Sequence, residues 1–248
     1  MSNIILPDVA ILAGGLGTRL RSVIGDLPKA LAPILGRPFL AYVLEQVDSH
    51  RFRRIIICCG HGAERIQNVF GYKYGGLELH YAVEDTPLGT AGALRAARRL
   101  IKTDAVMALN GDSFCDLDFE RLIRFHNSKS AELTLTLTGS IETARFGTAT
   151  TDNEGRICSF REKTPDNEPG WINAGIYVMQ KAWLNRLPEK TFYSLENDVL
   201  GSIKGQKIYG YKSFESIDRF IDIGTPESYR DALNFFCGGD SGKISTKF

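Results

Sequence analysis

The sequence predicts an α/β fold in one domain, with a mixed, mostly parallel central sheet and flanking helices. Apolar runs typical of buried strands alternate with segments of helical periodicity along most of the 248 residues. The chain contains no internal repeat and no long linker, and α/β folds of this length can form one unit. A glycine-rich turn follows the first apolar run, at the carboxyl end of the first strand, where open α/β sheets place ligands.

The first half of the chain predicts strands and helices in alternation. Ile66, Val69 and Phe70 recur at helical spacing, so we expect a helix with these three side chains on one face. The predicted strands cover residues 9–13, 54–59, 77–83 and 105–109. The predicted helices cover residues 38–49, 62–70, 90–100 and 119–126, with a short helix or structured loop over 16–23.

The second half of the chain adds strand pairs that need not be parallel. Alternating Leu and Thr predict a strand over residues 132–138. Asp152-Asn153-Glu154-Gly155 predicts a hairpin turn between two further strands. The strands expected here cover 148–151, 157–161, 172–179, 207–211 and 219–223, and the helices cover 182–187, 195–200 and 226–236. The domain is expected to span residues 1–236, with a disordered polar tail over 237–248.

Charge and cysteine content exclude several classes of protein. The net charge is +1, from 30 basic and 29 acidic residues, which argues against a nucleic-acid partner and against a polybasic membrane contact. The five cysteines include no Cys-x-x-Cys pair, so a disulfide framework or zinc site is not expected, and Cys58, Cys59 and Cys158 fit a core. The sequence shows no signal peptide and no apolar run of about 20 residues, the length that spans a bilayer. We expect a cytoplasmic protein.

The most informative stretch is the first apolar run with its turn, V-A-I-L-A-G-G-L-G-T-R-L over residues 9–20. Its three glycines let the backbone approach a ligand closely, and their N–H groups favour an anion. Arg19 adds a planar cation suited to phosphate. The turn lacks the Gly-Lys-Ser/Thr of the Walker loop, and Leu20 replaces the third glycine of the dinucleotide fingerprint. Taken alone, the glycines also fit an ordinary turn after a core strand.

Residues downstream of the turn favour a phosphate-binding turn over an ordinary turn after a core strand. Pro28-Lys29 and Pro33 complete a pattern that resembles the signature of the sugar-1-phosphate nucleotidylyltransferases, and the resemblance continues to Ile223-Gly224. It therefore covers nearly the whole chain and is greatest to the D-glycero-alpha-D-manno-heptose 1-phosphate guanylyltransferases. The resemblance implies a Rossmann-like, GT-A-like domain that transfers a nucleotidyl group from an NTP to a sugar 1-phosphate and releases pyrophosphate.

This chemistry predicts carboxylates for Mg²⁺ and basic side chains for phosphates, because a phosphate monoester is already ionised and needs no general base. Asp112 follows the predicted strand 105–109 at its carboxyl end, and Asp222 is a lone acid within an apolar run. A buried charge needs a partner, and Mg²⁺ takes one or two carboxylates plus phosphates. The resemblance implies that both aspartates hold Mg²⁺. The residues alone also allow a turn role for Asp112 and a structural partner for Asp222.

The resemblance also assigns the phosphate and sugar contacts. Arg19 and Lys29 would bind the triphosphate and, with Asp112, form the catalytic set. Glu162 would accept hydrogen bonds from sugar hydroxyls, and Lys163 would bind the sugar phosphate. An exposed ion pair is the alternative for these two. The implied sugar-phosphate site is Gly147, Glu162, Lys163 and Asn173.

Glu84 predicts which nucleobase of the NTP the site accepts. A carboxylate only accepts hydrogen bonds, and guanine offers N1–H and N2–H₂ side by side, whereas relatives that use pyrimidines commonly carry Gln here. We therefore expect GTP ahead of UTP. The implied nucleotide site is Leu12, Ala13, Gly14, Gly15, Gly17, Thr18, Arg19, Glu84, Pro87, Leu88, Gly89, Thr90 and Asp112.

Three rival interpretations stay open at this stage. One is a uridylyltransferase acting on N-acetylmuramate 1-phosphate or another hexose 1-phosphate. Another is a non-catalytic regulatory subunit that binds nucleotide sugars, although such proteins usually lose part of the cation and metal set. The third is a glycosyltransferase with an Asp-x-Asp metal motif, which Asp116-Leu117-Asp118 spells, although we expect these two aspartates to begin a helix. The sequence leaves the oligomeric state open, a homo-oligomer included.

Overall fold

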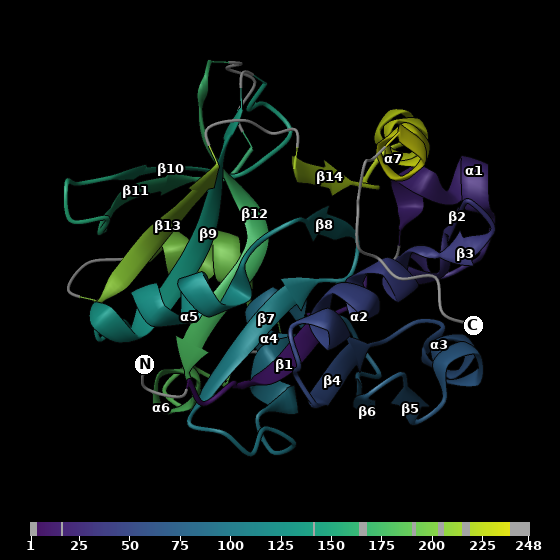
Figure 1. Ribbon diagram of the computed structural model, residues 1–248, viewed down its shortest axis with the longest axis horizontal. Helices are drawn as coiled ribbons and strands as arrows, with labels where there is room; N and C mark the ends of the chain where they lie inside the picture. Colours follow the sequence, from purple (N-terminus) through teal and green to yellow (C-terminus); the bar gives the residue numbers. More distant parts are fainter. Residues whose placement is uncertain are drawn as a thin grey trace.

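Strand β1 (Asp8–Leu12) lies in the middle of a ten-stranded mixed sheet in the computed structural model of the protein (Figure 1). The structure describes residues 4–15, 17–140, 142–163, 168–189, 192–202, 206–214 and 219–238. The main path of the sheet runs β11-β10-β12-β7-β1-β4-β6-β5, and β13 and β9 branch from β12. The α/β class predicted from the sequence is confirmed.

Four neighbouring strands form the parallel part of this sheet. Strand β1 pairs in parallel with β4 (Arg54–Cys59) and with β7 (Ala105–Asn110), and β4 pairs in parallel with β6 (Leu77–Val83). Helices cover both faces of parallel sheets, so their strands are expected to be continuous apolar runs. The bounds predicted for β4 and β6 agree with the structure.

The remaining strands are mostly antiparallel. Strand β12 (Gly170–Gln180) pairs with β9 (Leu133–Ser140) along one side, and along the other it pairs with β10 (Thr148–Thr151) near its start and with β7 near its end. Strands β10 and β11 (Ile157–Arg161) form the predicted hairpin. Strand β13 (Ile208–Phe214) runs parallel to β9, and β5 (Lys73–Tyr74) closes the far edge. The pairing of β12 with β7 joins the two halves of the sheet.

Two small two-stranded sheets contain the other strands of the described residues. Strand β14 (Phe220–Asp222) pairs antiparallel with β8 (Ser113–Cys115), and β2 (Pro33–Ile34) pairs with β3 (Arg37–Pro38). Strands β2, β3, β5 and β8 are two or three residues long, too short for a periodic pattern in the sequence. The β8–β14 pair matters most, since it brings residues about 110 positions apart into register near the carboxyl end of β7.

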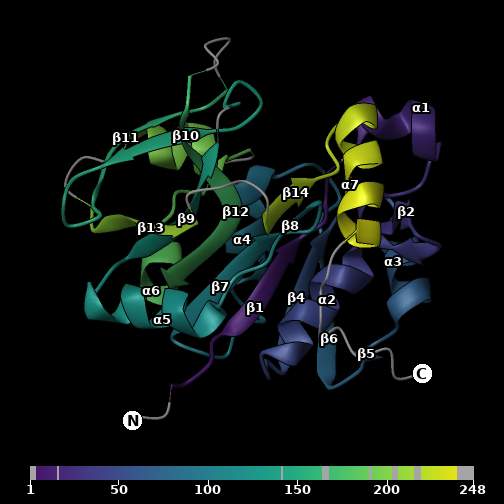
Figure 2. The same cartoon turned by 45° about the horizontal axis from the view of Figure 1, so that its top comes forward.

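Two hydrophobic cores lie on opposite faces of the main sheet, because successive strand side chains point to opposite sides. Val9 and Ile11 belong to one core and Ala10 to the other. The first core packs α2 (Phe39–Ser49), α3 (Ala63–Phe70), α5 (Phe119–Ser128) and α7 (Pro226–Gly238), and the second packs α4 (Gly89–Ala97) and α6 (Lys181–Leu184) (Figure 2). Helix α1 (Arg21–Ile24) is a single turn after the glycine-rich segment.

A few expectations are wrong in detail. Val69 is 53% exposed and Cys158 is exposed, so neither side chain belongs to a core. Helix α7 continues through Gly238, two residues past its predicted end at residue 236, and residues 239–248 lie outside the described residues. The predicted helix 195–200 is a π-helical turn at Leu195–Val199 followed by a 3₁₀ turn at Leu200–Ser202. In the described part of the chain, no helix has the length and hydropathy needed to span a bilayer.

Candidate active site

The glycine turn after β1 lies directly against Glu84, one residue past the end of β6. A Cβ added to Gly14 would lie 2.7 Å from Glu84 Oε1, and a Cβ added to Gly60 would lie 3.1 Å from Glu84 Cγ. A Cβ at either position would force Glu84 to shift, so the two glycines leave room for this side chain where it lies. The arrangement brings together two segments that the sequence predicted on either side of a base.

The Glu84 carboxylate has one oxygen without a hydrogen-bond donor among the described residues. Burial raises the pKa of its carboxyl, while a hydrogen bond from the Leu88 backbone opposes that rise. Its Oε2 is buried and accepts no hydrogen bond from any residue that the structure describes. A buried acceptor without a donor is costly, so this oxygen is suited to a ligand that donates.

The turn continues toward two basic side chains. Gly17 has a φ of 60°, a left-handed conformation that favours glycine, and it begins the 3₁₀ turn Thr18–Leu20 that carries Arg19. A Cβ on Gly17 would lie 3.4 Å from Lys29 Cβ, so the turn packs on the stem of Lys29. Gly111 N donates to Leu12 O at 2.8 Å, which brings the next residue, Asp112, beside the same turn.

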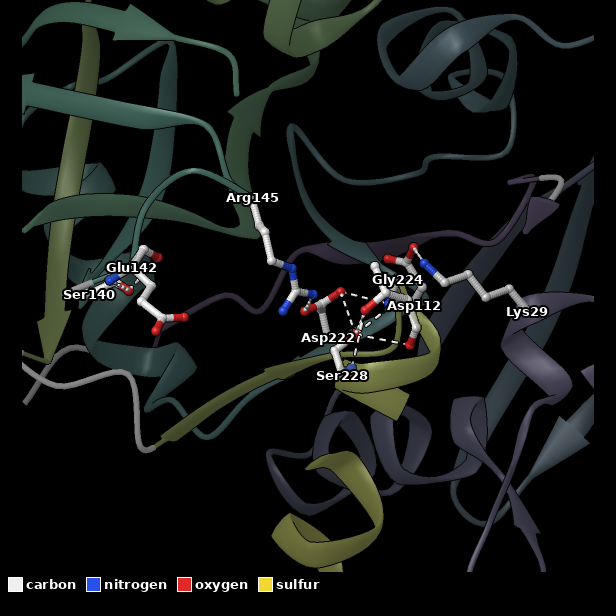
Figure 3. A network of polar contacts seen from close by, with 9 residues as sticks. Lys29, Asp112, Ser140, Glu142, Arg145, Asp222, Gly224 and Ser228 are labelled. Carbon is white, nitrogen blue, oxygen red and sulfur yellow. Dashed lines mark hydrogen bonds and ion pairs between the residues drawn. The ribbon is translucent and has the colours of Figure 1, made fainter. Parts of the chain in front are cut away.

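Asp112 immediately precedes β8 and Asp222 ends β14, the two strands of one small sheet. Asp222 is in register with Ser113, and Ile223 N donates to Asp112 O at 3.0 Å. Asp112 Oδ2 is 2.5 Å from Lys29 Nζ, and Asp222 Oδ1 is 2.7 Å from Arg145 Nη2 (Figure 3). Each carboxylate is thus paired with one cation at this end of the sheet.

The carboxylate pair fits a hard divalent cation. Both acids already attract positive charge, and Mg²⁺ prefers oxygen ligands, taking one or two carboxylates and completing its shell with phosphates and water. The described residues contain no group of three or more His, Cys, Asp and Glu side chains that could hold a metal by themselves. Asp112 and Asp222 could therefore hold a metal that arrives with a phosphate ligand.

The predicted sugar residues form part of the wall of the same pocket. A Cβ on Gly147 would lie 2.9 Å from Glu162 Oε2, and Gly147 O accepts from Asn173 N at 2.8 Å. Burial raises the pKa of Glu162, Lys163 at 3.8 Å lowers it, and Glu196 raises it further. The wall offers a carboxylate, an amide and an ammonium group, which suits a hydroxylated ligand with a phosphate.

Sequence reasoning missed several side chains of this pocket, of which Tyr177, Glu196 and Arg145 make the contacts that matter most. Tyr177 OH donates to Glu196 Oε1 at 2.9 Å and accepts from Asn173 Nδ2 at 2.7 Å. Thr90 Oγ1 donates to Glu196 Oε2 at 2.6 Å, so a chain of hydrogen bonds joins the predicted nucleotide segment to the predicted sugar wall. Arg145 is the third. Tyr177 was hidden inside an apolar strand and Glu196 inside an expected helix, so no signal in the sequence marked them.

Many of the predicted site residues line one pocket. Its lining includes the predicted residues Arg19, Lys29, Thr90, Asp112, Gly147, Glu162, Lys163, Asn173 and Asp222. The predicted residues Leu12, Ala13, Gly14, Gly15, Gly17, Thr18, Glu84, Pro87, Leu88 and Gly89 are not among its lining residues and follow the adjoining turn and the segment that begins α4.

The rival metal motif is used for other purposes. Asp116 forms an ion pair with Arg219 on the surface, and Asp118 caps α5 by accepting from Arg121 N at 3.1 Å. Neither aspartate lines the pocket. Asp118 therefore starts a helix, as the sequence analysis expected, whereas Asp116 lies before the cap and does not.

Comparison with known proteins gives consistent results. The model of the family described as nucleotidyl transferase matches residues 9–238. A D-glycero-alpha-D-manno-heptose 1-phosphate guanylyltransferase of Aneurinibacillus thermoaerophilus is 39% identical over 91% of this chain and 96% of that protein. A mannose-1-phosphate guanylyltransferase of Mycobacterium tuberculosis is 34% identical over 90% of this chain, which spans only 62% of that relative.

Solved structures show the same likeness. The crystal structure of HddC from Yersinia pseudotuberculosis is 32% identical, with a TM-score of 0.82, and the match covers 93% of this chain and 100% of that chain. The structure of HddC complexed with GMP-PN is 33% identical over the same share of both chains, with a TM-score of 0.79.

Proposed function

Because this chain belongs to the nucleotidyl transferase family, we propose that it transfers a guanylyl group from GTP to D-glycero-alpha-D-manno-heptose 1-phosphate. The products are a GDP-activated sugar and pyrophosphate. The family and the enzyme class were both predicted from the sequence, and both are confirmed. The substrates are the part of the assignment that we propose.

The observation that carries the proposal is the shared pocket. Lys29, Asp112, Glu162 and Lys163 all line it. The ammonium groups of Lys29 and Lys163 in one pocket suit two phosphate-bearing reactants that meet there. Holding both reactants in one geometry removes much of the entropic barrier to their reaction.

The proposed reaction needs no proton transfer. An ionised oxygen of the sugar phosphate attacks the α-phosphorus of GTP, and the bond between the α-phosphorus and its bridging oxygen breaks as pyrophosphate leaves. Arg19 and Lys29 orient the triphosphate and balance its charge. Asp112 and Asp222 would hold Mg²⁺, which would neutralise phosphate charge when bound.

The preference for GTP rests on Glu84. Its buried Oε2 accepts from no described residue, and the N1–H and N2–H₂ groups of guanine would supply two donors. Uracil offers a single N–H between two carbonyls, so a carboxylate would face acceptors. The relatives named as guanylyltransferases and the HddC complex with GMP-PN support the same choice.

Mannose 1-phosphate is the second candidate acceptor. The similarity to a mannose-1-phosphate guanylyltransferase favours it, and the hydroxyl-binding groups Glu162 and Asn173 suit either sugar. We propose the heptose first because the relative of matching length carries that name. We also propose a cytoplasmic location.

The test is pyrophosphate release with Mg²⁺ across four NTPs and a panel of sugar 1-phosphates that contains the manno-heptose, mannose, glucose and N-acetylmuramate compounds. Release is expected with GTP and the heptose and is expected to be lost in Lys29→Met. Release with UTP and N-acetylmuramate 1-phosphate would overturn the substrates and keep the chemistry. No release with any pair would favour the regulatory-subunit alternative.

A further inference from the structure

Asp222 presents its two carboxylate oxygens to different partners. Oδ2 accepts from Gly224 N at 2.6 Å and lies 3.4 Å from Ser228 Oγ, which fixes it at the start of α7. Oδ1 accepts from Arg145 Nη2 at 2.7 Å. Within the described part of the chain, Arg145 therefore holds the one oxygen of Asp222 that α7 leaves available.

Arg145 reaches Asp222 from a separate part of the fold. Its loop joins β9 to β10, whereas Asp222 ends β14, and Figure 3 shows the side chain extended between the two. The loop is fixed on both sides of Arg145: Ser140 Oγ donates to Glu142 O at 2.8 Å, and the Phe146 ring packs edge-on against Phe220. The guanidinium can leave Asp222 by side-chain rotation, with the backbone in place.

The two cations at the carboxylate pair differ in their freedom to move. Lys29 pairs with Asp112, but its side chain is 12% exposed and packs under Gly17. The Arg145 side chain is 41% exposed, so water or an incoming phosphate can replace Asp222 as its partner at small cost. Arg145 is therefore the exchangeable cation of the pair.

We propose that Arg145 is a placeholder for the divalent cation. In the nucleotide-free protein its guanidinium occupies the available oxygen of Asp222, and a metal ion binds that oxygen only when Arg145 leaves. This inference rests on the proposed function, in which Asp112 and Asp222 hold Mg²⁺. Like charges repel, so the guanidinium and a divalent ion do not share one carboxylate oxygen in the pocket.

Metal binding and nucleotide binding then become coupled. The phosphate oxygens of a nucleotide offer Arg145 a charged partner that replaces Asp222. Without nucleotide, the metal must displace Arg145 unaided and binds more weakly. Linkage requires the reverse as well: metal bound at Asp222 frees Arg145 for phosphate and strengthens nucleotide binding.

The test measures Mn²⁺ binding by the loss of the free-ion electron paramagnetic resonance signal, in wild type and in Arg145→Gln. In the nucleotide-free protein, the variant is expected to bind Mn²⁺ about three- to tenfold more tightly, since it removes both a competing ion pair and a nearby positive charge. With a non-hydrolysable GTP analogue, the difference should fall below about twofold, because Arg145 has already left Asp222.

Arg186→Gln is the matched control. It removes an exposed arginine that pairs with Glu132, and neither residue lines the pocket. The control should bind Mn²⁺ as wild type does. Thermal melts of every variant establish that it is folded before titration.

Equal or weaker Mn²⁺ binding by nucleotide-free Arg145→Gln would overturn the placeholder role. Asp222→Asn separates this failure from a failure of the metal assignment. If Asp222→Asn weakens Mn²⁺ binding while Arg145→Gln changes nothing, only the placeholder is wrong. If Asp222→Asn also leaves Mn²⁺ binding unchanged, the proposed metal ligand itself is wrong.

Discussion

Replacing Glu84 with glutamine should reduce the use of GTP and stabilise the free protein at the same time. The carboxylate occupies space left by Gly14 and Gly60, and its Oε2 accepts from no described residue. Glu84→Gln keeps the shape of the side chain but turns one acceptor into a donor. Facing the donors of guanine, that group loses one charge-assisted hydrogen bond, about 2–3 kcal/mol, so kcat/KM for GTP should fall about 30- to 150-fold.

The stability change has the opposite sign. Burial raises the pKa of Glu84, so at neutral pH the ionised side chain destabilises the folded protein. Glutamine removes that charge, and we expect the free energy of unfolding to rise by about 1 kcal/mol, at the low end of the cost of a buried unsatisfied group. The difference should shrink as the pH falls through the raised pKa, because the wild-type acid then becomes neutral.

Two assays decide this prediction. Pyrophosphate release gives kcat/KM with GTP and with UTP, and urea unfolding gives the stability of the nucleotide-free protein at several pH values. Glu78→Gln, which changes an exposed acid on β6, the strand that Glu84 follows, is the matched control and should change neither quantity. An unchanged ratio of GTP to UTP use in Glu84→Gln would refute the assignment of Glu84 to the base.

Four further predictions concern the pocket. In Gly147→Ala the new Cβ would lie 2.5 Å from Phe160 Cζ and 2.9 Å from Glu162 Oε2, so KM for the sugar 1-phosphate should rise about 5- to 100-fold, and an equal rise in KM for GTP would contradict this. Burial raises the pKa of Glu162, so sugar binding should weaken as pH falls, starting at a higher pH than for an ordinary glutamate, and Glu162→Gln should flatten this profile in KM measurements. Asp112→Asn should lower kcat at least about a hundredfold, and near wild-type turnover with Mg²⁺ would exclude it as a ligand. Asp116→Asn should keep kcat within about twofold and the free energy of unfolding within about 0.5 kcal/mol, and a large loss of transfer would revive the Asp-x-Asp motif.

The sequence predicted the strands whose buried side chains leave a clear pattern of apolar residues. Strands β4 and β6 have the predicted bounds, because β4 is a buried apolar run that ends before a glycine and β6 begins with buried leucines alternating with polar residues. The same reasoning failed for Val69 and Cys158, whose apolar neighbours did not reveal that their own side chains face water. Strand β8 has three residues and depends on its partner β14, so its pairing could not be read from local pattern.

Site residues could be predicted where they belong to a motif of fixed spacing along the chain. Arg19, Lys29 and Asp112 follow recognisable motifs and line one pocket. Arg145 and Glu196 reach that pocket through tertiary contacts with Asp222 and Tyr177, which no local pattern encodes. Local motifs thus identified the chemistry, and the fold was needed to find the side chains that organise it.

The most direct test of direct guanylyl transfer follows the oxygen atoms of the sugar phosphate. The acceptor is prepared with ¹⁸O at its three non-bridging phosphate oxygens, and both products are analysed by mass spectrometry after reaction with GTP and Mg²⁺. Attack by the sugar phosphate on the α-phosphorus predicts that all three labels remain in the nucleotide sugar and that pyrophosphate carries none. Label in pyrophosphate, or loss of label from the nucleotide sugar, would contradict the mechanism.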